Sequence, residues 1–110
     1  MTLTLDLEQV GRDNEKALAR VAQATHEQFD NEATDIERLL SALFGFTVMA
    51  VRREQQIERA AEIWRAVLGI FELSARRMQA LAAPHPGNHP SVGNVVRLRE
   101  AASEMLALCE

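Results

Sequence analysis

Three histidines and a single cysteine are the residues of this chain best suited to bind a metal ion. His85 and His89 lie within the proline-rich segment 84–90, and Cys109 lies near the end of the sequence. A structural zinc ion needs four ligands, and this spacing through a proline-rich segment does not match the usual zinc patterns. We therefore expect no metal and no cofactor, and we interpret the two histidines as solvated loop residues. Cys109 has no evident partner base, which indicates a small packing residue or an incidental thiol rather than a nucleophile.

Acidic residues gather around the remaining histidine, in a segment that holds His26, Glu27, Asp30, Glu32, Asp35 and Glu37. Carboxylate-bridged metal bundles use Glu-x-x-His motifs on facing helices. No such motif is present, because the residue three positions before His26 is Gln23. The simpler interpretation is a solvated acidic helix face. No pattern indicates catalytic residues, so we expect that the protein is not an enzyme.

Six arginines could contact phosphates, as two adjacent pairs and two single residues: Arg52 and Arg53, Arg76 and Arg77, Arg59, and Arg65. Glutamates interrupt the series, and Glu72 precedes Arg76 by four residues, the favourable order on a helix. The formal net charge is −4, whereas general nucleic-acid binders are usually basic. We interpret the series as a mixed-charge helix surface. A nucleic-acid-associated regulator that uses this face is kept as the alternative function.

The segment 56–82 contains the most regular apolar pattern of the sequence. Its apolar residues recur at steps of three and four, which is typical of one face of an α-helix. A second apolar set beside the first widens this face, so the helix must be covered on more than one side. We expect a helix over residues 48–83 that ends at Pro84. The side chains expected in its core are Trp64, Val67, Phe71 and Met78.

The first half of the chain also has helical spacing, over residues 7–44. Asp6 and Gln9 have the spacing of a helix start. Thr25 and Glu32 interrupt the apolar stripe, and each is either an exposed residue or a buried polar residue that fixes register. A break within residues 30–34 is the alternative to one continuous helix, and we expect the continuous helix. Residues 45–47, Gly-Phe-Thr, are expected to form the turn into the second helix.

A loop over residues 84–90 and a third helix over residues 92–109, capped at Ser91 or Asn94, complete the predicted architecture. The chain has only 5 Gly and 3 Pro in 110 residues, a composition that long helices tolerate better than sheets do. We therefore predict an all-α single domain. It consists of a long antiparallel helical hairpin and a shorter third helix, and it completes a helical bundle by dimerisation.

The dimerisation hypothesis rests on how much apolar surface the third helix can cover. A short third helix, tethered at the open end of the hairpin, leaves the half near the turn only two helices thick. Apolar surface that stays exposed on a soluble protein usually marks an interface. The predicted interface residues are Phe29, Ile36, Leu40, Phe44, Phe46, Val48 and Val51. The expected partner is a second copy of the chain or another helical protein.

The compartment and the function class follow from composition. One cysteine cannot form an internal disulfide, the first ten residues do not resemble a secretory signal, and no apolar run is long enough to span a bilayer. We expect a cytoplasmic protein without a membrane segment. The predicted function is that of a non-enzymatic interaction or regulatory protein that acts through helical surfaces. A ligand- or metal-binding helical bundle is the weaker alternative.

Overall fold

The computed structural model describes residues 5–110, and within this range it contains helices and no strand. This confirms the predicted all-α class. The chain forms four helices rather than three. They are α1 (Leu7–Gln23), α2 (His26–Arg53), α3 (Ile57–Ala82) and α4 (Pro90–Cys109).

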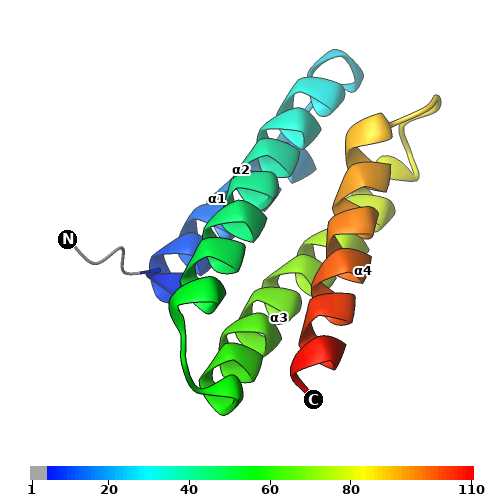
Figure 1. Cartoon of the computed structure of the whole chain (residues 1–110). Helices are drawn as coiled ribbons and strands as arrows, with labels where there is room; N and C mark the ends of the chain where they lie inside the picture. Colours follow the sequence, from blue (N-terminus) through cyan, green and yellow to red (C-terminus); the bar gives the residue numbers. More distant parts are fainter. Residues whose placement is uncertain (1–4) are drawn as a thin grey trace.

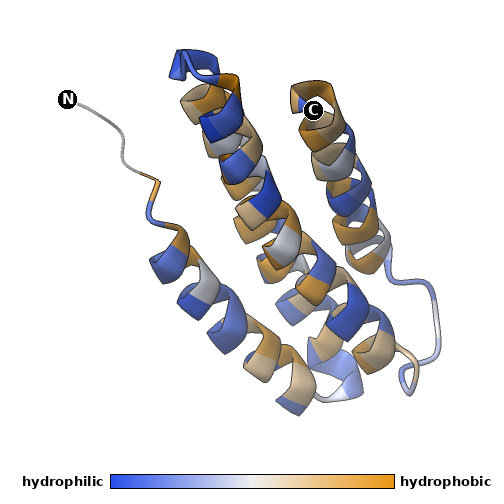
Figure 2. Ribbon diagram, turned by 90° about the horizontal axis from the view of Figure 1, so that it is seen from below, coloured by the Kyte–Doolittle hydropathy of each residue, from blue (hydrophilic) through white to orange (hydrophobic). Residues whose placement is uncertain are grey.

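The four helices run alternately up and down, so that helices adjacent in the chain are antiparallel (Figure 1). Helices α2 and α3 form the central pair, because each of them packs against all the other helices. Helices α1 and α4 lie on opposite sides of this pair and do not contact each other (Figure 2). The bundle therefore covers its own central helices from two sides.

The continuous helix predicted over residues 7–44 is wrong, because the chain turns back at Ala24 and Thr25. Thr25 adopts an extended conformation, with ψ of 170°, and is the N-cap of α2. The side-chain Oε1 of Gln28 accepts a hydrogen bond from the Thr25 backbone N–H at 3.4 Å. Thr25 and Gln28 thus have the spacing of a capping box, which was the available signal for this break. The alternative of a break within residues 30–34 is also wrong, because these residues lie inside α2.

The turn predicted at Gly45, Phe46 and Thr47 is also wrong, since all three residues lie inside α2. The Thr47 hydroxyl donates to the Leu43 carbonyl at 2.7 Å, so this buried side chain is satisfied within its own helix. Among the described residues, Gly87 alone has a positive φ, of 121°. Gly45 therefore adopts ordinary helical backbone angles. Packing of the helix outweighs the intrinsic cost of about 1 kcal/mol for a glycine at this position.

The actual connection between α2 and α3 lies within the polar run of residues 52–56. Glu54 is extended, and its side chain accepts a hydrogen bond from the Gln56 backbone N–H at 3.1 Å. Polar side chains in this run provide no apolar face for a continued helix. Helix α3, which corresponds to the second helix of the predicted hairpin, therefore begins at Ile57, nine residues after the predicted start at Val48.

The loop before the last helix agrees with the prediction to within two residues. Helix α3 ends at Ala82, and α4 begins at Pro90, where a proline suits the first helical position. His89 is the N-cap, instead of the predicted Ser91 or Asn94. Those two side chains contact α2: the Ser91 hydroxyl lies 3.1 Å from the Thr34 hydroxyl, and Asn94 donates to Glu37.

The core lies along α3, as the apolar spacing of that segment predicted. Trp64, Val67, Phe71 and Met78 have no exposed surface. Apolar and polar residues alternate along the helices (Figure 2), and the apolar ones meet between α3 and its neighbours. Asp6 caps α1 as predicted, because its Oδ1 accepts from the Gln9 backbone N–H at 3.1 Å.

Candidate functional site

Several residues of the predicted interface are buried within the bundle. Phe29, Ile36 and Leu40 have no exposed surface and belong to the core. They are covered because the break at residues 24 and 25 folds α1 back along α2, while α4 packs on α2 from the other side. These three residues are therefore core residues, and their assignment to an interface is wrong.

The other predicted interface residues lie at the edge of the core or outside it. Phe44 is half-buried, and its ring centroid lies 5.3 Å from that of Trp64. Val48 and Val51 are also half-buried against the core. Only Phe46 projects clearly into solvent, with 51% of its surface exposed.

Large exposed apolar side chains occur at one end of the described bundle. They are Phe46 and Met49 near the end of α2, Ile57 at the start of α3, and Leu108 in the last turn of α4. In Figure 1 the end of α2 and the start of α1 lie side by side at the lower left, and the start of α3 and the end of α4 lie at the bottom. Phe46, Met49 and Ile57 expose 51%, 44% and 58% of their surface, more than core packing would leave. We call this region the apolar end.

A groove of about 630 Å³ lies within the apolar end, between the start of α1, the end of α2 and α3. Its lining is mainly apolar and includes Leu5, Leu7, Val10, Phe46, Met49 and Ile63. Three charged side chains, Asp6, Arg53 and Glu54, also line it. No ion pair with Arg53 forms within the part of the chain that the structure describes. The groove thus combines apolar walls with both signs of charge.

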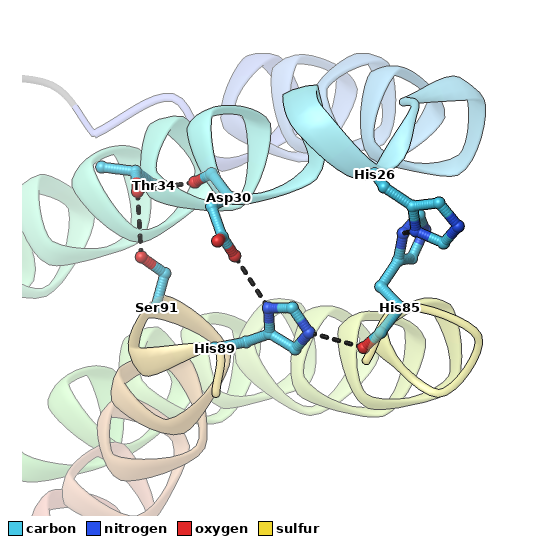
Figure 3. A network of polar contacts seen from close by, with 6 residues as sticks. All are labelled: His26, Asp30, Thr34, His85, His89 and Ser91. Atoms are coloured by element: carbon cyan, nitrogen blue, oxygen red, sulfur yellow. Dashed lines mark hydrogen bonds and ion pairs between the residues drawn. The ribbon is translucent and has the colours of Figure 1, made fainter. Parts of the chain in front are cut away.

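The histidines gather at the opposite end of the bundle, where the turn between α1 and α2 meets the loop between α3 and α4 (Figure 3). His26 belongs to the first turn of α2, His85 to the loop and His89 to the N-cap of α4. The aromatic ring of Phe29 packs between the last two, with centroid distances of 4.4 Å to His85 and 4.9 Å to His89. The sequence analysis did not anticipate this cluster, because His26 is 59 residues from His85.

Both ring nitrogens of His89 face hydrogen-bond acceptors. Nε2 lies 2.8 Å from the His85 carbonyl oxygen, and Nδ1 lies 2.7 Å from the Asp30 carboxylate. Only the protonated ring can donate to both. The hydrogen bond to the His85 carbonyl, together with that to Asp30, accordingly raises the pKa of His89 above its ordinary value.

The rings of His26 and His85 share one hydrogen bond, with their Nδ1 atoms 2.6 Å apart. One Nδ1 must donate and the other must accept, so at least one of the two rings is neutral. Removal of water around the ring, and then the neighbouring charges of His26 and His89, lower the pKa of His85, although Asp30 acts in the opposite direction. The arrangement therefore favours the charged form of His89 and the neutral form of His85.

His85, His89 and Cys109, which the sequence analysis considered and rejected as a zinc site, do not come together as one set of ligands. Cys109 lies at the end of α4 remote from His85 and His89, about 30 Å away at a rise of 1.5 Å per residue. Within residues 5–110, no group of three or more histidine, cysteine or acidic side chains is arranged to hold a metal ion. None of the helices in this range is long and apolar enough to span a membrane.

The acidic and basic surfaces of the sequence are partly paired with each other. Glu32 lies 3.6 Å from Arg20, which joins α2 to α1. Arg65 and Arg77 pair with Glu110 and Glu15 at 3.2 and 3.9 Å. Such exposed pairs contribute little stability individually. The pairs do place negative side chains among the arginines, which agrees with the mixed-charge helix surface that we inferred from the sequence.

Comparisons of the chain with protein-family models, with curated proteins and with solved structures found no match.

Proposed function

We propose that this protein is a non-enzymatic helical interaction protein that associates with a second copy of itself through the apolar end. The observation that carries the proposal is the exposure of Phe46 and Met49 on the wall of one apolar groove, with the exposed Ile57 at the same end of the bundle. An exposed apolar region with a polar rim is typical of a protein–protein interface. The homodimer is thus the one expected from the sequence, but its interface lies at the end of α2 and the start of α3.

Energetics favour an interface of this kind. Full burial of one large apolar side chain is worth about 1.5–3 kcal/mol relative to leaving it in water. A two-fold axis presents the same residues on both copies, so each contribution occurs twice. These side chains are already about half covered, so each gains only part of this free energy. The total over both copies is still of the same order as the cost of association, about 4–15 kcal/mol.

Charge at the groove supports a second copy as the partner. Arg53 lines the same groove as the carboxylates of Asp6 and Glu54. A two-fold arrangement can place Arg53 of one copy against the carboxylates of the other, so the patch is complementary to itself. The nucleic-acid alternative has less support, because the formal net charge is −4 and two of its six arginines, Arg65 and Arg77, pair with glutamates of the same chain.

The decisive measurement is the molar mass in solution, determined by sedimentation equilibrium over a range of concentrations. We expect a dimer for the unchanged chain and a monomer for Phe46→Asp. Ala42→Asp is the matched control, because Ala42 is also exposed on α2 but does not line the groove. It should leave the dimer intact. Circular dichroism should show that both variants keep their helices.

Charge reversal gives a second test within the same patch. Arg53→Glu should weaken the dimer, and the neighbouring change Arg52→Glu should not, because only Arg53 lines the groove. A monomer for the unchanged chain at the highest soluble concentration would contradict self-association. Equal effects of the two reversals would contradict the two-fold pairing of charges.

A further inference from the structure

We propose that His26, His85, His89 and Asp30 form a pH-sensitive clamp that is closed between α2 and the α3–α4 loop near neutral pH and loses its His26–His85 contact in acid, which loosens the loop. The four side chains come from α2, from the loop and from the N-cap of α4. Their contacts join residues that are 59 positions apart in the sequence. We call this group the histidine clamp.

The first half of the clamp is the single hydrogen bond between His26 and His85. Their Nδ1 atoms are 2.6 Å apart, and the rings meet edge to face with centroids separated by 4.5 Å. When both rings are protonated, each Nδ1 carries a hydrogen and no acceptor is left between them. Two like charges then lie in contact, so the pair must separate. Acid therefore breaks this half of the clamp.

The second half of the clamp responds in the opposite direction. His89 donates from both ring nitrogens only when it is protonated, to the His85 carbonyl and to Asp30. Loss of that proton at higher pH removes one of the two hydrogen bonds. The clamp is consequently complete only where His89 is charged while the His26–His85 pair keeps a neutral ring.

The charged and titratable groups that act on the clamp are few. His26 and Asp30 face it from α2, while His85 and His89 belong to the loop and to the start of α4. The nearby carboxylate of Glu32 on α2 is turned to Arg20 on α1. The acid response therefore falls on the histidine pair, because protonation of both rings removes the acceptor that their shared hydrogen bond needs.

Release of the clamp would affect both the loop and the core beneath it. Pro84, Pro86, Gly87 and Asn88 are exposed, so the loop has little other packing. The His85 ring stacks on Phe29, which has no exposed surface while the clamp is closed. Opening in acid would therefore uncover an apolar side chain at the end of the bundle remote from the apolar end.

Hydrogen exchange followed by mass spectrometry on the full chain tests the proposal. Exchange of the loop amides, residues 83–89, is measured at pH 7 and at lower pH values and corrected for the intrinsic pH dependence of exchange. Opening that takes up one proton should raise the corrected rate by up to about tenfold per pH unit below the midpoint. Peptides from the centre of α3, around Phe71, should show no such rise, because they report global unfolding.

His26→Gln separates the clamp from other effects of acid. The glutamine carbonyl can accept from His85 whether or not His85 is charged, and it brings no second cation. The acid-induced rise in loop exchange should therefore disappear in this variant and persist in the control Glu104→Gln, which is exposed on α4. A loop whose corrected exchange does not change with pH, or an acid response that survives His26→Gln, would overturn the proposal.

Discussion

Asn14 on α1 donates a hydrogen bond from Nδ2 to the hydroxyl of Ser74 on α3, over a distance of 2.7 Å. Both side chains are buried, with exposed fractions of 1% and 0%. The Oδ1 atom of Asn14 has no partner among the described residues. The pair thus fixes how α1 lies on α3, and its amide is only partly satisfied.

Removal of one partner from this pair should destabilise the protein more than removal of both. Ser74→Ala leaves the amide of Asn14 buried without a partner, and we expect a loss of about 1–3 kcal/mol in the free energy of unfolding. The double variant Asn14→Leu, Ser74→Ala should lose less than the sum of the single changes. Urea denaturation measures all three. Additive losses would show that the two side chains are not coupled.

Trp64 lies at the centre of the core, against the ring of Phe44 and without exposed surface. We expect Trp64→Ala to lower the free energy of unfolding by about 3–5 kcal/mol. The native protein should also show the blue-shifted fluorescence of an indole shielded from water. Glu62→Gln, at an exposed side chain of the same helix, is the control and should change stability by about 0.5 kcal/mol or less. Emission typical of hydrated indole would contradict the burial.

Two glycines distinguish the observed turns from the predicted ones. Gly45 lies inside α2, and an added Cβ there would meet no atom within 4 Å, so Gly45→Ala should stabilise the protein by about 0.5–1 kcal/mol. Gly87 has a φ of 121°, so Gly87→Ala should destabilise it through backbone strain. Thermal unfolding compares the two variants. A loss of stability in Gly45→Ala would instead support a turn at residue 45.

Stability should vary with pH on both sides of the ordinary imidazole pKa of 6.5. The pKa of His89 is raised by its bonds to the His85 carbonyl and Asp30, so its contribution is complete below 6.5 and is lost as pH rises through the raised value. The pKa of His85 is lowered, so stability falls as pH drops from 6.5 toward that lowered value. His89→Gln should flatten the alkaline side of the profile, and His85→Gln the acid side. The profile is measured as the midpoint of urea unfolding at several pH values between 5 and 8. If the midpoint of both variants varied with pH as it does in the unchanged chain, this prediction would be contradicted.

The sequence by itself determined the helical class and the identity of the central helix. Apolar residues at steps of three and four placed Trp64, Phe71 and Met78 on one face of α3, where the structure buries them. Local signals also sufficed for the cap at Asp6 and for the end of α3 before Pro84. These features depend on neighbouring residues in the chain, so their patterns are visible without a fold.

Only the tertiary structure decided where the long helices break and which apolar residues stay exposed. The local preferences of Thr25, Gly45 and Thr47 differ by about 1 kcal/mol or less, which packing of whole helices outweighs. Once the chain turned at Thr25, packing of α1 and α4 against α2 left Phe29, Ile36 and Leu40 buried and Phe46, Met49 and Ile57 exposed.

The histidine clamp likewise depended on the fold. His26 and His85 are 59 residues apart, and no local pattern links them. They meet because α1 and α2 turn at the same end of the bundle at which the α3–α4 loop crosses (Figure 3). A contact of this kind depends on the packing of helices far apart in sequence, and that packing is the part of the structure that local spacing does not encode.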